Sequence, residues 1–331
     1  MGNYLKLFDT HSEYVAFTQT EDFILPNVSH CIDNNEVHYN PILSYREQYF
    51  TVEALESGLF NIYLDDTYSY VGNHPESITS YLEYSIDGGT TWVRASYIED
   101  EYSSTTPITL NEGDKVLIRG INNSLGAMAW DSQQNIAGFD FKSNQDEPKR
   151  FNVYGNILSL LYGDNFINQT TLPFYEVGEG YGEYGRHFAK LFDQSGIVSA
   201  ENLILPNDVA INCYYGLFMR CTNLITPPKL PATTLEEYCY TYMFDRCSSL
   251  ETAPELPATT LTNYCYQGMF RNCSLLNSVK CLATDISAIS CTNDWLNNVA
   301  ATGTFTKAAS MSSWTTGADG IPNGWTIENA S

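Results

Sequence analysis

The side chains that could do chemistry are few and scattered. The chain has five histidines, and it contains no Gly-x-Ser-x-Gly, P-loop or His-Glu-x-x-His motif. Adjacent carboxylates such as Asp65 and Asp66 occur, but a sequence does not place two carboxylates across a cleft. We therefore predict that the protein is not an enzyme. A glycan-active enzyme whose site has no recognisable motif stays open as an alternative.

One group of residues approximates a set of metal ligands: His30, Cys31, Glu36 and His38. Zinc sites in proteins usually carry closely paired ligands on both sides of the metal, and this segment offers one cysteine and two histidines. Ordinary packing is the favoured interpretation, and we expect neither a metal site nor a cofactor.

The segment from Ser85 to Trp92 reads Ser-Ile-Asp-Gly-Gly-Thr-Thr-Trp and matches the pattern S-x-D-x-G-x-x-W. This pattern resembles the Asp-box of sialidase-type propellers, where Asp and Trp stabilise a hairpin turn. Because it occurs once and without a propeller repeat, we interpret it as a device of the fold.

The cysteines reveal a repeat. Four of them are separated by 26 residues each, and three more follow eight residues later in each copy: Cys213, Cys239, Cys265 and Cys291, then Cys221, Cys247 and Cys273. Such a ladder predicts a solenoid of stacked 26-residue coils with the cysteines buried as a structural core ladder. The Cys-x7-Cys spacing is not that of a zinc site. We expect unpaired thiols, which suit a reducing compartment.

Within one coil, Leu235, Cys239, Met243 and Cys247 fall four residues apart. We interpret this spacing as the apolar stripe of a short helix, followed by an extended piece from Leu250 onward. The predicted fold is multidomain, with an all-β sandwich followed by an α/β leucine-rich-repeat solenoid.

Three segments follow from the change in pattern along the chain. Residues 1–45 form an N-terminal docking segment. Residues 46–150 read as a β-sandwich, because short alternating runs such as Phe60, Ile62 and Leu64 are separated by Gly/Asp turns. Residues 151–331 form the repeats with a C-terminal cap, in about five coils.

Tyrosines are the main candidates for binding, because the chain has 24 of them and many fall outside the apolar stripe. Tyrosine offers contact area and a hydroxyl group at low entropy cost, although the same residues could simply fill the core. The candidates are three in the Gly-rich loop Pro173 to Arg186 (Tyr175, Tyr181 and Tyr184) and four in the repeats (Tyr215, Tyr238, Tyr242 and Tyr264).

Charge and hydropathy exclude some partners. Acidic residues outnumber basic ones 39 to 16, for a formal net charge of -23. Nucleic acid and anionic lipid would repel such a surface, so we expect neither as a partner. No apolar run approaches the length of a membrane span, and the N-terminus lacks the pattern of a secretory signal.

The repeat string L-P-A-T-T-L-x-x-Y-C-Y-x-x-M-F-x-x-C-x-x-L resembles the BspA-like leucine-rich repeats, in a version found in gut Bacteroidales and in their crAss-like phages. The closing segments around Trp314 and Trp325 and the early string from Leu25 to Cys31 are similar to elements of the same proteins. The resemblance implies an adhesion protein of a virion or a cell surface.

Since this chain shows no export signal, we expect a phage virion structural or adhesion protein, such as a tail or head appendage, assembled in the host cytoplasm. Its N-terminal part would bind other virion proteins, and its repeats would bind a host surface glycan or protein. Formation of a homo-oligomer stays open. The alternative is a bacterial cell-surface adhesin of the same family.

Overall fold

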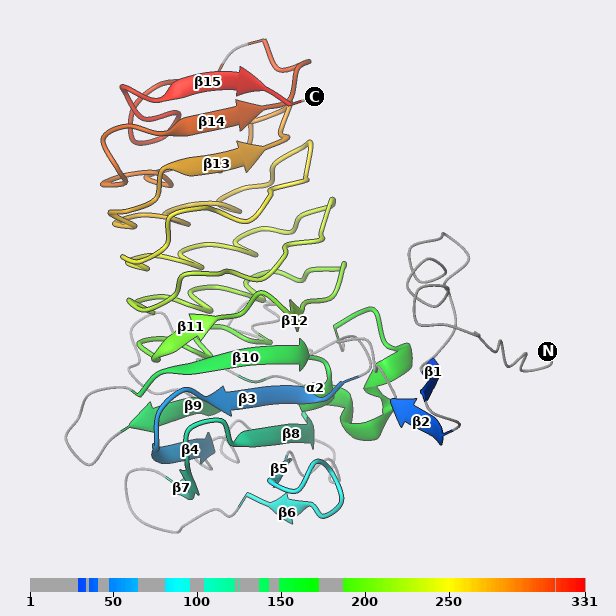
Figure 1. The fold of residues 1–331 in the computed structure, drawn as a ribbon. Coiled ribbons are helices and arrows are strands. Elements are labelled where there is room, and N and C mark those ends of the chain that lie inside the picture. Colours follow the sequence, from blue (N-terminus) through cyan, green and yellow to red (C-terminus); the bar gives the residue numbers. More distant parts are fainter. Residues whose placement is uncertain are drawn as a thin grey trace, which may run out of the picture.

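The computed structural model describes residues 29–33, 36–40, 48–64, 81–95, 104–122, 125, 137–142, 149–172, 187–312 and 314–330. Strands dominate these residues (Figure 1). The helices among them are one short α-helix, α2 (Ser159–Tyr162), and the 3-10 helix η3 (Gly163–Asn168) that follows it. A separate antiparallel hairpin of β1 (Ser29–Asp33) and β2 (Glu36–Asn40) places Cys31 opposite His38 in its backbone register.

Two sheets face each other in the lower part of Figure 1. The larger has the order β11-β10-β3-β8-β5-β6, with β12 also pairing with β10, and the smaller has the order β7-β4-β9. The strands of the larger sheet are β3 (Phe50–Ala54), β5 (Tyr81–Ser85), β6 (Val93–Arg94), β8 (Lys115–Ile121), β10 (Phe151–Asn156), β11 (Ile197–Ser199) and β12 (Leu203–Ile204). Those of the smaller are β4 (Gly58–Leu64), β7 (Ser104–Leu110) and β9 (Ala137–Lys142). Apolar side chains alternate toward the space between the sheets, where the rings of Phe60 and Phe151 lie 6.3 Å apart.

Strand β10 belongs to both halves of the molecule. It pairs antiparallel with β3 on one edge, and parallel with β11 and β12 on the other. Gly155 makes the close approach to the segment before β3 feasible, because a Cβ at this position would lie 2.1 Å from the carbonyl oxygen of Tyr49. Its φ of +82° is also one that glycine adopts readily. The chain therefore passes from the facing sheets into the repeats through a continuous sheet.

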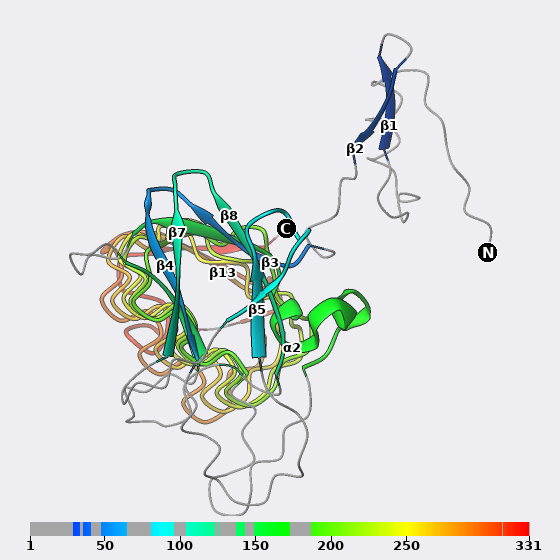
Figure 2. The same ribbon diagram turned by 90° about the horizontal axis from the view of Figure 1, so that it is seen from below.

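From residue 187 onward the chain forms flat layers of 26 residues, which are piled above the facing sheets (Figure 1) and superimpose when viewed along the pile (Figure 2). On one side of each layer, successive backbone N–H groups donate alternately to the next layer and to their own layer. Tyr214 and Gly216 donate to carbonyl groups of the next layer at 3.0 and 2.9 Å, and the intervening Tyr215 donates to the carbonyl of Asn212 in its own layer at 3.2 Å. Each layer is therefore a series of turns that pairs with its neighbour.

The predicted α/β leucine-rich-repeat solenoid is wrong, because these turn segments contain no helix within the described residues. The physical reason is a left-handed residue at every fourth position: Asn212, Gly216 and Arg220 have φ values of 58°, 59° and 62°. A residue of positive φ interrupts the i to i−4 hydrogen bonds of an α-helix. The terms leucine-rich repeat and solenoid therefore do not describe this structure, which consists mostly of strands and turns with small open sheets.

The interior of the pile is built from columns of equivalent side chains. One column runs Phe192, Phe218, Phe244 and Phe270, with adjacent ring centroids 5.3 to 5.5 Å apart. Phe50 on β3 stacks on the first of these rings at 5.7 Å, so the facing sheets cap the column. Stacked aromatic pairs contribute about 0.5 to 1.5 kcal/mol each beyond the burial of their area.

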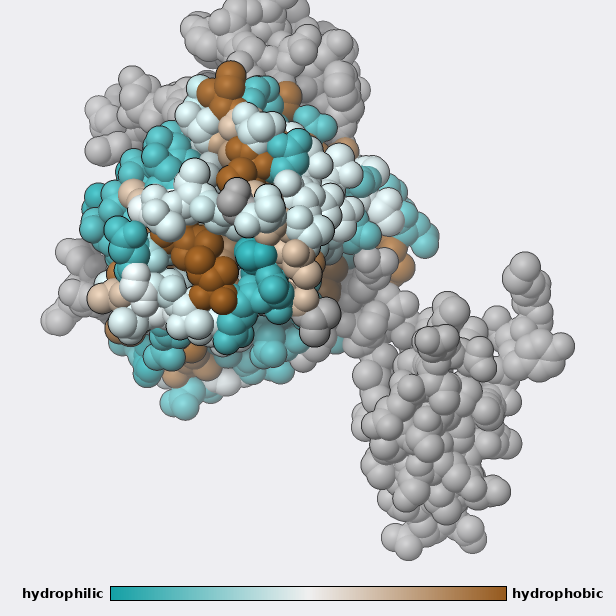
Figure 3. Space-filling view, turned by 90° about the horizontal axis from the view of Figure 1, so that it is seen from above, coloured by the Kyte–Doolittle hydropathy of each residue, from teal (hydrophilic) through white to brown (hydrophobic). Residues whose placement is uncertain are grey.

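The last layers form a parallel sheet of β13 (Ser278–Cys281), β14 (Thr304–Lys307) and β15 (Thr326–Asn329). Trp295 closes a second aromatic column, with Tyr266 at 6.2 Å on one side and Trp314 at 5.5 Å on the other. Seen from above, this end of the molecule shows apolar patches among polar side chains (Figure 3). Ile327 on β15 is 48% exposed.

Candidate binding surface

The turn side of the layers carries the most distinctive surface of the described residues. Left-handed backbone positions recur there at intervals of four within a layer and 26 between layers, and most of their non-glycine side chains are exposed or half-buried. Tyrosines and basic residues gather at and beside these positions. We call this set the tyrosine rim: Tyr215, Tyr238, Tyr242 and Tyr264, with Lys190, Arg220, Arg246 and Arg271.

Two rim tyrosines form a parallel stack. The rings of Tyr238 and Tyr264, at equivalent positions of neighbouring layers, lie 4.6 Å apart with an angle of 3° between their planes. The equivalent positions in the layers before and after hold Asn212 and Ser290. The stack is therefore two rings long, and its two members are half-buried.

Tyr242 links the layers on either side of its own. Its ring meets Tyr215 edge-on at 5.6 Å, and the guanidinium of Arg271 lies 4.8 Å from its centroid. A Cβ at position 268 would approach the Tyr242 ring to 2.1 Å, so glycine is required there for this ring position. The ammonium group of Lys190 lies 5.9 Å from the Tyr215 ring. Both tyrosines thus combine an aromatic face with a cation.

Buried aspartates hold two of the rim arginines in place. The carboxylate of Asp245, whose side chain is 3% exposed, accepts hydrogen bonds from Arg271 at 3.0 and 3.1 Å. Asp193, two layers earlier, accepts one from Arg220 at 2.9 Å and pairs with the same guanidinium through its second oxygen. Each aspartate raises the pKa of its arginine through these hydrogen bonds. Fixed guanidinium groups keep less conformational entropy to lose when a ligand binds.

The arrangement suits recognition. Half-exposed tyrosine rings beside arginines are the residue types that dominate the binding energy of interfaces. Four of the 16 basic residues lie on this rim. Three of them are paired with the carboxylates of Asp193 and Asp245, so the rim presents fixed guanidinium groups beside its aromatic rings.

The four tyrosines predicted in the repeats lie on the described part of the chain, and the structure brings them together as two ring contacts, Tyr238 with Tyr264 and Tyr215 with Tyr242. The three predicted in the loop, Tyr175, Tyr181 and Tyr184, lie outside the described residues. Sequence reasoning did not identify the basic partners. The partners of Tyr215 and Tyr242 are Lys190 and Arg271, which lie 25 and 29 residues away in the sequence, so no local spacing indicates them.

The cysteine columns lie inside the layers and away from this rim. The eight described cysteines are buried and free. Cys221, Cys247 and Cys273 each donate to a carbonyl group of the preceding layer, at 3.0 to 3.1 Å. Burial raises the pKa of Cys221, Cys265 and Cys281 to about 12. Thiols with such pKa values are poor nucleophiles at neutral pH.

The Asp-box segment forms a compact turn between β5 and β6. Asp87 accepts hydrogen bonds from the backbone N–H of Thr91 at 2.9 Å and from its hydroxyl at 2.6 Å, and Ser85 contacts the same carboxylate at 2.7 Å. The Thr91 hydroxyl is the largest of the causes that lower the pKa of Asp87 to about 2. The guanidinium of Arg119 lies 4.0 Å from the Trp92 ring. These contacts explain the motif as a stabilised hairpin.

Among the residues whose side chains are described, no three histidine, cysteine, aspartate or glutamate side chains form a group that could hold a metal ion. His30, Cys31, Glu36 and His38, for which ordinary packing is the favoured interpretation, lie on β1 and β2, and the structure describes the backbone of these strands.

None of the helices in the described part of the chain has the length and apolar character needed to cross a membrane. Comparisons with protein-family models, with curated proteins and with solved structures found no match to this chain.

Proposed function

We propose that this protein is a non-enzymatic binding protein that recognises a receptor on a bacterial surface through the tyrosine rim. The observation that carries the proposal is the clustering of four half-buried tyrosines and four basic residues on one side of a regular pile of layers. Regular layers make this surface long and stiff, as binding platforms built from repeats generally are.

The setting proposed for this activity is a phage virion, in which the chain is a tail or head appendage held by its N-terminal part. The likeness of the repeat string to proteins of gut Bacteroidales and their phages supports this setting. Eight free, buried cysteines are consistent with assembly in a reducing cytoplasm. The alternative setting is the surface of a bacterial cell.

Mass spectrometry of purified phage particles distinguishes these settings. Detection at a fixed copy number beside capsid and tail proteins supports the virion. Detection in bacterial envelope fractions alone rejects it in favour of an adhesin. Turnover of a host polysaccharide by the purified chain would instead establish an enzyme.

The rim itself is tested by binding of the fluorescently labelled chain to a panel of Bacteroidales strains, measured by flow cytometry. We expect the double variant Tyr238→Ala/Tyr264→Ala to weaken binding by roughly 30-fold or more, since central tyrosines of interfaces cost about 2 kcal/mol or more when truncated. Thr234→Ala, at an exposed position of the same layer, is the matched control. Equal binding by both variants would reject the rim as the receptor site.

A further inference from the structure

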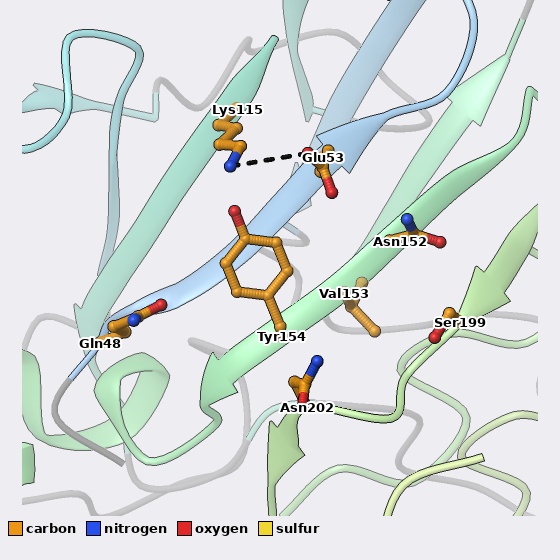
Figure 4. A pocket seen from close by; sticks show the side chains of 8 residues that line it. All are labelled: Gln48, Glu53, Lys115, Asn152, Val153, Tyr154, Ser199 and Asn202. Carbon is orange, nitrogen blue, oxygen red and sulfur yellow. Dashed lines mark ion pairs between the residues drawn. The ribbon is translucent and has the colours of Figure 1, made fainter. Parts of the chain in front are cut away.

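A second surface feature lies where the facing sheets join the layers. It is an open hollow with a volume of about 300 Å³, on the outer face of β3, β8 and β10, bordered by residues of β11 and of the turn before β12 (Figure 4). This volume is at the lower end of the range of about 300 to 1,000 Å³ found for small-molecule sites. The hollow therefore has room for one small molecule.

The strand pattern explains the polar character of the hollow. On β3 and β10 the apolar residues Phe50, Val52 and Phe151 are buried, and the alternate residues Glu53 and Asn152 are half-buried on the outer face. Tyr154 follows on the same face of β10, and its ring lies across the middle of the hollow (Figure 4). Of the lining residues, Val153 alone has an apolar side chain.

The far side of the hollow is fixed by the backbone. The N–H of Gly155 donates to the carbonyl oxygen of Asn202 at 3.1 Å. Leu203, which follows Asn202, pairs with Gly155 in the parallel register of β10 and β12. Ser199 thereby lies beside Asn152, with which it pairs in the strand register, and Asn202 lies at the Tyr154 end of the hollow (Figure 4). Residues from four separate segments of the sequence thus line one hollow, and strand hydrogen bonds hold these segments together.

The charges of the hollow compensate each other. The ammonium group of Lys115 lies 3.6 Å from a carboxylate oxygen of Glu53 and 5.6 Å from the centroid of the Tyr154 ring. The Tyr154 hydroxyl is the largest cause that raises the pKa of Lys115, and Glu53 adds to it. The site carries one cation and one carboxylate, already paired, so neither an anion nor a metal ion finds an excess of opposite charge there.

The remaining lining groups are amides and a hydroxyl, from Gln48, Asn152, Ser199 and Asn202. Amide side chains present donors and acceptors at fixed separation, and each hydroxyl group of a sugar both donates and accepts. A carboxylate and an ammonium group extend the same pattern, and an aromatic ring offers a face to the C–H groups of a pyranose. A neutral, polyhydroxylated molecule matches every one of these groups.

We propose that this hollow is a binding site for one neutral sugar unit of a glycan, separate from the tyrosine rim. An apolar ligand would offer no hydrogen bond to the amides of Asn152 and Asn202, and a phosphate or sulfate would face the carboxylate of Glu53. The proposal goes beyond receptor recognition by the rim, because it rests on a different set of residues.

The test uses the full chain and four probes: methyl glycosides of glucose, galactose, mannose and N-acetylglucosamine. Saturation-transfer NMR is expected to show binding of at least one of them, and a titration gives its affinity. Loss of the two amides in Asn152→Ala/Asn202→Ala is expected to weaken that affinity about tenfold or more. Tyr238→Ala/Tyr264→Ala, on the rim, is expected to leave it unchanged.

A measurement on the unaltered chain guards against a variant that fails to fold. Amide chemical shifts of residues 152–154 and 199–202 are expected to move on addition of the bound glycoside. The proposal is overturned if none of the four glycosides binds, or if the shifts that move lie elsewhere in the chain. Since receptor binding by the rim is measured on cells with different variants, either proposal can fail without the other.

Discussion

Removal of a buried hydroxyl group from the core is expected to stabilise this protein. Tyr240 is 1% exposed, and its ring is stacked between Tyr214 at 5.7 Å and Tyr266 at 6.2 Å. Its hydroxyl has no hydrogen-bond partner among the described residues, and burial raises its pKa well above the ordinary value. The substitution Tyr240→Phe removes this group and leaves the ring contacts in place.

The magnitude follows from the cost of burying an unpaired hydroxyl, which is about 1 to 3 kcal/mol. Phenylalanine leaves a gap the size of one oxygen atom, so we expect a gain at the lower end, about 1 kcal/mol in the free energy of unfolding. A gain of 1 kcal/mol corresponds to a rise in melting temperature of roughly 2 to 4 °C for a cooperative unit of about 150 to 250 residues.

The assay is urea unfolding followed by fluorescence, with the slope against denaturant checked for constancy between variants. The matched control is Tyr49→Phe, because the hydroxyl of Tyr49 donates to Asp164 at 2.8 Å. That variant is expected to lose about 1 kcal/mol. If Tyr240→Phe loses stability as the control does, the hydroxyl is paired and the reasoning about this column is refuted.

Three further predictions concern the core, the shared strand and the Asp-box turn. Met243→Asp is expected to lower the free energy of unfolding by at least about 3 kcal/mol, because it buries an unpaired charge. Glu236→Lys, at an exposed position of the same turn segment, is expected to change it by no more than about 0.5 kcal/mol. Similar unfolding midpoints for the two variants would contradict the assignment of buried and exposed positions. Gly155→Ala is expected to lower the free energy of unfolding by more than about 2 kcal/mol, since the added methyl group would lie 2.1 Å from the Tyr49 carbonyl oxygen and residue 155 has a φ of +82°. Thermal unfolding of the variant measures this loss. An unchanged melting temperature would argue against the close approach of residue 155 to Tyr49. Asp87, with a pKa lowered to about 2, stabilises its turn at pH values above its unfolded pKa of about 4, and that contribution is lost as pH falls toward 2; an NMR titration of its carboxylate with a midpoint near 4 would disprove the hydrogen-bond network.

The repeat could be predicted from the sequence, but the local structure of its apolar stripe could not. Leu235, Cys239, Met243 and Cys247 are all buried, as an apolar spacing of four suggests. An α-helix of 3.6 residues per turn would rotate successive members of this series by about 40°, so the fourth would lie about 120° from the first. A strict spacing of four over twelve residues favours a unit with a period of four, which the turns supply. The left-handed positions gave only a partial signal. Asn212, Gly216 and Gly268 are residue types typical of positive φ. Tyr238, Tyr242 and Arg246, at other such positions, are not.

The candidate surfaces could be predicted from the sequence only in part. Tyr215, Tyr238, Tyr242 and Tyr264 could be selected because they fall outside the apolar stripe, but their pairing depends on the distance between layers. The hollow beside Tyr154 could not be predicted from the sequence, since it joins residues of β3, β8 and β10 with residues of the turn before β12. Nothing in the local pattern indicates that these segments become neighbours in one sheet.

The double pairing of β10 bears on how the molecule transmits force. Backbone hydrogen bonds fix this strand to β3 on one edge and to β11 and β12 on the other, so within the described residues β10 ties the layers to the facing sheets along both of its edges. Bending the layers against the facing sheets would require several of these bonds to break together. A load applied at the far end of the layers would therefore pass to the facing sheets as it does along a rigid rod, and the orientation of the rim would follow that of the facing sheets.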